Sequence, residues 1–173
     1  MTLTARVASS RIALPVLRLC TLLAFMLLAS GSAIAAWSCS ISSTPLSFGT
    51  YDVFSATPDD STATLSVTCT QVSNPVGNLP VTASLSRGSG ASYAARRMAS
   101  GANLLSYNMY SNATHTTIFG DGTSGTSTIS GTFPFTAVGQ TFTGTGTIYG
   151  RIPAGQDVAV GAYADSIVAT ITW

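Results

Sequence analysis

The sequence of 173 residues contains little charge. Charged residues make up 8% of it, against about 25% in an average globular protein. All seven basic residues are Arg and all six acidic residues are Asp, so Lys and Glu are absent, and His115 is the single histidine. Acid–base and nucleophilic catalysis usually draws on His, Glu or Lys, and a net charge of +1 is too small to attract nucleic acid. The composition therefore disfavours both an enzyme and a nucleic-acid-binding protein.

Catalytic and metal-binding motifs are also missing. The sequence has no G-x-S-x-G turn that would present a serine to His115. Asp59-Asp60 and Asp121-Gly122 fall in predicted turns, and no acidic loop has the spacing of a calcium site. Arg96-Arg97 is too small a basic patch to follow a phosphate backbone. We predict no catalytic residue, no cofactor and no metal; a secreted hydrolase that uses His115 is the weakest alternative.

The first 35 residues predict a cleaved signal peptide. Three arginines precede an uninterrupted apolar run at 19–29, which is shorter than the roughly 20 residues that cross a bilayer. Ala33-Ile34-Ala35 fits the A-x-A cleavage pattern, so Ala36 is the expected first residue of the mature chain. Contact with a membrane would then end with cleavage. The alternative is a retained N-terminal anchor.

Cleavage would leave residues 36–173 as one domain with two cysteines, Cys39 and Cys69, and a formal charge of −2 from four Arg and six Asp. An even pair of cysteines in an oxidising compartment predicts a disulfide. Closing a loop of this length stabilises the fold by roughly 3.5 kcal/mol in the chain-entropy model. Two buried free thiols or half of a zinc site are the alternatives.

The mature sequence predicts an all-β fold. It contains 20 Ser and 22 Thr, and Thr suits the pleated surface of a sheet. Apolar and hydroxyl residues alternate with a period of two at 65–69, 81–85, 105–109 and, apart from Val168, at 167–173, the pattern of half-buried antiparallel strands. Turn-forming clusters separate these segments. We therefore expect a β-sandwich or a barrel.

The segment from Gly139 to Gly150 is the most repetitive part of the chain. Four threonines alternate there with Phe142, Gly144, Gly146 and Ile148. Glycines on one face of a strand leave room for the close approach of another group. The segment predicts either a weak edge strand or a groove that accepts an inserted segment.

A series of short motifs gives the chain a resemblance to a known family. In chain order they are Cys39, Phe48-Gly49-Thr50-Tyr51-Asp52, Val67-Thr68-Cys69, Arg97-Met98, Leu105-Ser106-Tyr107-Asn108-Met109-Tyr110, Gly120-Asp121-Gly122, Tyr149-Gly150-Arg151-Ile152-Pro153-Ala154-Gly155-Gln156, Gly161-Ala162-Tyr163-Ala164-Asp165-Ser166 and Trp173. In this order and spacing they resemble the spore coat protein U domain, the family that includes subunits of archaic chaperone–usher pili. The resemblance covers essentially the whole mature domain.

The resemblance implies an incomplete immunoglobulin-like β-sandwich that lacks one strand. A periplasmic chaperone lends a strand to such a subunit, and at the outer-membrane usher the N-terminal extension of the next subunit replaces it. The expected contact for the chaperone and the donor strand is the last strand of this chain. Its residues Ile167, Ala169, Ile171 and Trp173 fall on one face, and we expect no further strand after Trp173 to cover the edge.

One departure from the family pattern affects the expected place in a fibre. A polymerising pilin of this family has roughly 10–15 residues before its first cysteine to serve as a donor strand. Here only Ala36-Trp37-Ser38 would precede Cys39. A subunit with so short an N-terminal segment can accept a strand but has little with which to donate one, so we expect it at the fibre tip or in a coat outside a fibre.

We therefore expect a secreted structural subunit of a pilus, fimbria or coat, exported through the periplasm to the cell surface and serving attachment or biofilm formation. Its expected partners are a periplasmic chaperone, an outer-membrane usher and other pilus subunits. The alternative function is a free-standing module that binds a surface or a glycan through loops around four tyrosines: Tyr93, Tyr107, Tyr110 and Tyr149.

Overall fold

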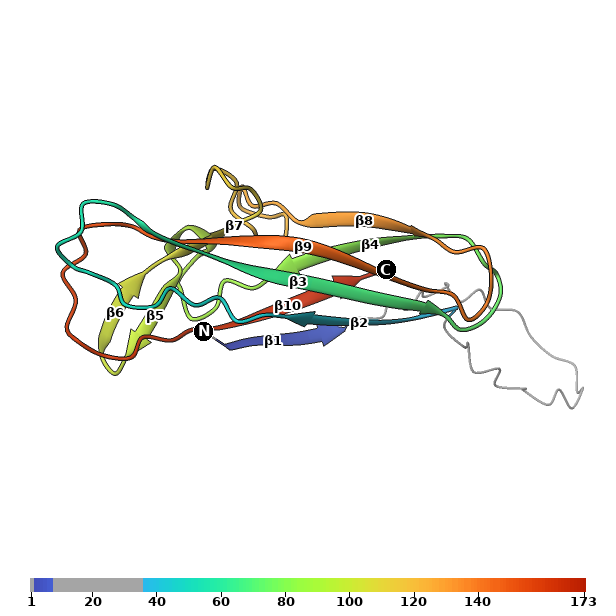
Figure 1. The fold of residues 1–173 in the computed structure, drawn as a ribbon, viewed down its shortest axis with the longest axis horizontal. Coiled ribbons are helices and arrows are strands. Elements are labelled where there is room, and N and C mark those ends of the chain that lie inside the picture. Colours follow the sequence, from blue (N-terminus) through green and yellow to red (C-terminus); the bar gives the residue numbers. More distant parts are fainter. Residues whose placement is uncertain (1, 8–35) are drawn as a thin grey trace, which may run out of the picture.

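The computed structural model describes residues 2–7 and 36–173, which contain ten strands and one short 3-10 helix (Figure 1). The elements are β1 (Thr2–Val7), β2 (Trp37–Ser43), β3 (Asp59–Gln71), β4 (Asn78–Leu85), η1 (Tyr93–Ala95), β5 (Arg97–Ser100), β6 (Asn103–Ser106), β7 (Asn108–Tyr110), β8 (Ile129–Pro134), β9 (Thr141–Ile152) and β10 (Ser166–Thr172). The predicted all-β class is confirmed. Within these residues no helix is long and apolar enough to span a membrane.

Most of the predicted signal peptide, 1–35, lies outside the described residues, and its cleavage stays a prediction. Only β1 from that segment is described.

Two four-stranded sheets form the body of the protein. We call them the β10 sheet, with strand order β1-β10-β4-β8, and the β3 sheet, with strand order β2-β3-β9-β7; β5 and β6 form a separate hairpin at one end (Figure 1). Every strand pair is antiparallel except β1 with β10, which is parallel. Buried side chains from both sheets make one hydrophobic core. This is the packing of a β-sandwich.

The alternation of apolar and hydroxyl residues places the apolar side chains in this core. Residues 65–69 lie within β3, 81–85 within β4 and 167–172 within β10, and alternate side chains of each strand are buried. Three of the four predicted strands are therefore confirmed.

The fourth predicted strand, 105–109, is wrong as a single element. It is divided at Tyr107 between β6, which pairs with β5, and β7, which pairs with β9. Tyr107 is 2% exposed, and its hydroxyl donates to the buried carboxylate of Asp165 at 2.8 Å. The side chain of Gln156 accepts from the backbone N–H of Ser106 and donates to its C=O. These contacts replace ladder hydrogen bonds at the point where the chain changes sheets.

Two predicted polar features are also corrected. Asp59 and Asp60 do not form a turn but begin β3, and both oxygens of Asp60 accept from the guanidinium of Arg151 on the neighbouring strand at 2.7 Å. A bidentate pair of this kind requires the register that β3 and β9 have.

Arg96 and Arg97 do not form a basic patch, because Arg96 is fully buried. Its guanidinium donates to the side chain of Asn108 and to the backbone carbonyls of Ser86 and Phe119 at 2.8–2.9 Å. Arg96 therefore joins several loops internally and presents no charge to a partner.

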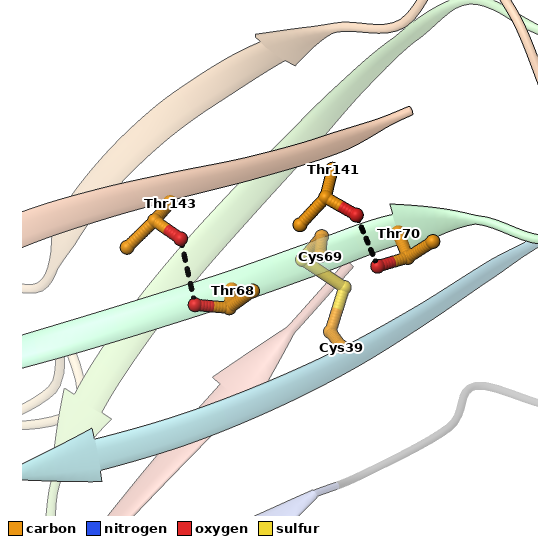
Figure 2. Close-up of a disulfide and its surroundings, with 6 residues drawn as sticks. All are labelled: Cys39, Thr68, Cys69, Thr70, Thr141 and Thr143. Carbon is orange, nitrogen blue, oxygen red and sulfur yellow. Dashed lines mark hydrogen bonds between the residues drawn. A yellow bond between two sulfur atoms is a disulfide. The ribbon is translucent and has the colours of Figure 1, made fainter. Parts of the chain in front are cut away.

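The predicted disulfide between Cys39 and Cys69 is confirmed. The two residues lie directly opposite each other in the β2–β3 pair, so the bond connects the first strand after the predicted cleavage site to its neighbour (Figure 2). Cys69 is buried, while Thr68 and Thr70 on either side of it point to the other face of the strand.

The glycine-rich segment forms β9. It pairs with β3 over its whole length but with β7 only at 149–151, so within the described residues 141–148 has one unpaired edge. A Cβ atom at Gly144 would lie 3.0 Å from the ring of Phe133, and one at Gly146 would lie 3.4 Å from Ile129. β9 is therefore an edge strand over 141–148, as one of the two interpretations predicts. Ile129 and Phe133 of β8 fill part of the space that the glycines leave, and a small apolar hollow of about 110 Å³ remains between these residues.

Candidate strand-addition site

The outer edge of β10 differs from the other sheet edges in what covers it. On its inner side β10 pairs with β4, from Ala169 opposite Leu85 to Thr172 opposite Thr82. On its outer side it pairs in parallel with β1, from Thr2 to Val7. β1 also contacts β2 of the other sheet, so it lies where the two sheets meet on this side (Figure 1). A strand from the predicted signal peptide thus pairs with an edge that would otherwise expose unpaired backbone N–H and C=O groups.

The side chains of β10 alternate across the sheet. Ile167, Ala169 and Ile171 are fully buried with β1 in place, and Trp173 packs against the core while partly exposed. Ser166, Val168, Thr170 and Thr172 fall on the opposite face. All four residues predicted for chaperone and donor-strand contact therefore lie along this edge and on its inward face. Their contact with a partner stays a prediction.

A polar network at the start of β10 contains two of the family-motif residues. The carboxylate of Asp165 accepts from the Tyr107 hydroxyl at 2.8 Å and from the N–H and hydroxyl of Ser89 at 3.1 and 2.9 Å. Burial, together with the hydrogen bond to Asp165, raises the pKa of Tyr107 well above its ordinary value. The phenol therefore stays protonated and donates to Asp165. The network fixes the residue immediately before Ser166, where β10 begins.

The other motif residues gather at the same end of the sandwich, where β3 begins and β9 ends. The Tyr51 hydroxyl donates to the carbonyl of Pro153 at 2.8 Å and accepts from the N–H of Gln156 at 3.0 Å. A Cβ at Gly150 would lie within 3.0 Å of Leu46 and Phe48 side-chain atoms. Tyr163 donates to the carbonyl of Ala159 at 2.7 Å, and Gly161 lies against Ser100. These motif residues therefore pack the loops around the start of β3 and the end of β9.

A groove at this end was not predicted from the sequence. It has a volume of about 810 Å³ between the loops 46–54 and 158–163. Phe54 and Val160 in these loops are 94% and 104% exposed. The sequence feature that could have predicted this groove is a pair of apolar stretches within segments otherwise rich in turn formers: Val53-Phe54 and Val158-Ala159-Val160.

The tyrosines that the alternative function requires do not form one loop surface. Tyr107 is buried, whereas Tyr110 and Tyr149 lie on β7 and β9 and flank the ring of His115 at 5.2 and 6.2 Å between centroids. The side chain of His115 is 8% exposed, with Nε2 3.8 Å from Asp60. Within the described residues no group of three or more His, Cys, Asp or Glu side chains is placed to hold a metal ion.

Comparison with known proteins shows the family. The model of the Spore Coat Protein U domain matches residues 24–170. The chain is also 39% identical over 135 residues to Protein U of Myxococcus xanthus, an alignment that covers 74% of this chain and 71% of that protein. The chain belongs to the Spore Coat Protein U domain family, as the motifs predict.

A solved structure shares the fold. It is one chain in the CsuC-CsuE chaperone-tip adhesion subunit pre-assembly complex from the archaic chaperone-usher Csu pili of Acinetobacter baumannii. The similarity has a TM-score of 0.50 at 20% identity and covers 79% of this chain but 40% of that chain. The shared part is therefore the all-β domain described above.

Proposed function

We propose that the protein is a structural subunit of a surface pilus or coat, assembled by addition of a partner strand along β10. The observation that carries this proposal is the pairing of β10 with β1, a strand from the predicted signal peptide. Cleavage after Ala35 would remove β1 and leave the outer edge of β10 without a paired strand. Membership of the Spore Coat Protein U domain family supports the same function, and so does the fold shared with one chain of a chaperone–tip adhesion subunit complex.

Strand addition follows from the chemistry of this edge. Main-chain hydrogen bonds from a partner strand would satisfy the outer N–H and C=O groups of β10, and alternate side chains of the partner would pack over the inward residues and set the register. We propose a periplasmic chaperone as the first donor and a neighbouring subunit at an outer-membrane usher as the second. This function requires no catalytic residue.

The start of β2 supports a position at the fibre tip. β2 begins at Trp37, which pairs with Gln71 inside the domain's own sheet. After cleavage at the predicted site only Ala36 would remain outside this strand, and one residue cannot complete another subunit. We infer that this subunit receives a strand but donates none, and so terminates a fibre or belongs to a coat outside one.

The exposed loops support a role in attachment. Phe54 and Val160 expose apolar side chains at the end of the sandwich where β10 begins. Water-exposed apolar side chains beside a groove are typical of an interaction site. We propose this end, rather than the disulfide end, as the part of a surface-displayed subunit that contacts a surface during adhesion or biofilm formation.

Co-expression tests the proposal. We expect the full-length chain, exported in a Gram-negative host, to co-purify with the periplasmic chaperone of its own organism. Its measured mass should be that of a chain that starts at Ala36. A mature chain that begins well upstream of residue 29 would contradict the tip position. A folded monomer that never binds the chaperone would overturn strand addition and favour the free-standing binding module.

A further inference from the structure

The outer edge of β9 is open over most of its length. β9 pairs with β3 from Thr141 to Ile152 but with β7 only at 149–151, and no other strand of the described residues bonds to it. The free segment is 141–148, and its sequence contains no charged residue and no proline. Edge strands of natural sheets often carry such residues, which keep other strands away. The free segment therefore lacks the features that prevent pairing with a further strand.

The hydrogen bonds of β3 show which backbone groups of β9 point to the free edge. The N–H of Gln71 donates to the C=O of Gln140 at 2.9 Å, so Gln71 faces β9. The C=O of Thr64 accepts from the N–H of Thr44 at 3.0 Å on the β2 side, so it does not bond Thr147, its partner in register. These directions alternate along a strand. The N–H and C=O groups of the threonines in the free segment therefore point away from β3, where a further strand can bond them.

The sequence of the free segment is nearly palindromic. Residues 142–148 read Phe-Thr-Gly-Thr-Gly-Thr-Ile, with Thr145 at the centre. An antiparallel pair of two such strands, related by a two-fold axis at Thr145, places threonine opposite threonine and glycine opposite glycine. Phe142 of each copy then lies opposite Ile148 of the other. Pairs of threonines and pairs of an aromatic with a β-branched residue are among those that stabilise antiparallel sheets.

The domain's own sheet already contains threonine pairs of this kind. Thr143 lies directly opposite Thr68, and Thr141 lies opposite Thr70. In each pair the hydroxyl oxygens are 2.8 Å apart and hydrogen-bonded (Figure 2). A hydroxyl group donates one hydrogen bond and accepts two, and the threonines of β9 are exposed. Their hydroxyls can therefore bond a second row of threonines on the free side of β9.

The inward side of the free segment has room for a second copy. An apolar hollow of about 110 Å³ lies between β8 and β9, lined by Gly144 and Gly146 and by core side chains of β3 and β4. In the paired strands glycine faces glycine on this side, so the second copy brings no side chain against Ile129 and Phe133, which lie beside these glycines. Removal of the apolar lining from water would stabilise the contact.

We propose that the free segment of β9 pairs antiparallel with the same segment of a second copy of the chain, about a two-fold axis at Thr145. The two β3 sheets then form one continuous sheet. A strand of unrelated sequence would satisfy the backbone groups but not the pairing of like with like, so the palindrome favours a second copy. The contact ends where β7 takes over the edge at Tyr149. β10 belongs to the other sheet, so this contact does not depend on strand addition.

Cysteine substitutions test the register. Thr145→Cys places two thiols opposite each other, with Cα atoms about 5.5 Å apart in a hydrogen-bonded pair, which is within the range of a disulfide. The full-length chain is exported to an oxidising compartment, purified with any chaperone that co-purifies, and run on a non-reducing gel. We expect a disulfide-linked dimer.

Thr143→Cys is the matched control. Thr143 would face Thr147 of the second copy, and the two copies of Thr143 would be about 13 Å apart along the strand, too far for a disulfide. This variant should give no linked dimer. The double variant Thr143→Cys/Thr147→Cys should restore the link, because each new cysteine then faces the other kind.

Sedimentation measures the contact without a covalent bond. We expect the wild-type particles to double in mass as the concentration rises. Thr145→Lys places like charges opposite each other at the axis and should raise the dissociation constant of the dimer about tenfold. Thr64→Lys adds the same charge on an exposed residue of β3, one strand away from the edge, and should leave the constant unchanged. If Thr145→Lys does not unfold cooperatively, Thr145→Asp takes its place.

Three results would overturn the proposal. In the first, folded Thr145→Cys stays unlinked, or the wild-type particles contain one copy at every concentration. In the second, Thr143→Cys links as readily as Thr145→Cys, or Thr64→Lys weakens the dimer as much as Thr145→Lys. In the third, Thr145→Cys becomes linked to a different protein, and the edge then accepts a strand of another chain.

Discussion

The two long sides of the sandwich are closed in different ways. On the side of β10 and β2, a strand fills the space, and that strand is β1. On the side of β8 and β9, no strand of the described residues bridges the two sheets, and phenylalanine rings fill the space instead. Phe133 stacks on Phe142 at 6.0 Å between centroids, and Phe135 meets Phe142 edge-on at 5.0 Å.

The difference shows which side of the sandwich is closed by residues that follow the predicted cleavage site. Gly144 and Gly146 let the β8 side chains approach the β3 sheet, so the chain closes this side with its own residues. The β10 side is closed by residues that the sequence predicts to be removed. We therefore expect changes on the β8–β9 side to alter stability by moderate amounts, and changes at β10 to decide whether the domain folds.

Ile171→Asp should have the largest effect. Ile171 is fully buried on the inward face of β10, and an unpaired buried carboxylate costs several kcal/mol. We expect no folded protein even with the chaperone present, measured as soluble yield and cooperative urea unfolding. Thr172→Asp, one residue further on the exposed face, should change stability by less than about 0.5 kcal/mol. Equal yields of the two variants would contradict the assignment of the inward face.

Cys39→Ser should have the next largest effect. The disulfide spans 30 residues, and its loss should lower the free energy of unfolding by about 3.5 kcal/mol. Urea denaturation of the purified protein measures this loss. Wild-type protein treated with a reductant serves as the control and should show the same decrease; a reduced wild type as stable as the oxidised form would contradict the prediction.

Gly144→Val probes the side that the chain closes itself. The added side chain would meet the Phe133 ring, and overpacking of this kind costs about 1–3 kcal/mol. Gly131→Val is the control on β8. A Cβ at Gly131 would meet nothing within 4 Å, and Gly131 lines a small apolar hollow. We expect this control to be neutral or stabilising in thermal unfolding. Destabilisation by Gly131→Val as large as that by Gly144→Val would show that the rings do not close this side.

Asp60→Asn should have the smallest effect. The hydrogen bond from Arg151 holds the pKa of Asp60 below its ordinary value, partly opposed by desolvation and aided by His115. A depressed carboxyl pKa stabilises the fold above the ordinary value of about 4, and this stability is lost as the pH falls through the lowered pKa. For a partly exposed pair the contribution is about 0.2–1 kcal/mol. Urea unfolding at pH 7 and pH 2.5 should show this contribution to the free energy of unfolding in the wild type and not in Asp60→Asn. In the wild type, 1 M salt should weaken the contribution.

Much of the fold follows from local pattern. The period-two alternation of 65–69, 81–85 and 167–172 depends only on which face of a strand is buried, so it could be predicted residue by residue. The division at Tyr107 could not, because it depends on Asp165, which is 58 residues away in the chain. The same holds for Arg96, whose partners come from three separate segments.

The candidate site could be predicted only in part. The last strand and its inward face follow from alternation. The prediction that its outer edge takes a partner strand came from resemblance to a family, since no local pattern says which edge of a strand lacks a neighbour. The groove between the loops 46–54 and 158–163 also depends on how distant segments pack. Its exposed Phe54 and Val160 are visible in the sequence only as apolar residues in turn-rich segments.

Completion of the mature domain by an added strand tests the central claim most directly. Residues 36–173 are produced in an oxidising compartment alone, and in a second form with an alternating apolar and polar strand joined after Trp173 by a short turn. The account predicts that the first form aggregates or unfolds without cooperativity, and that the second is a soluble monomer with one cooperative urea transition. A cooperative, monomeric first form that is as stable as the second would contradict it.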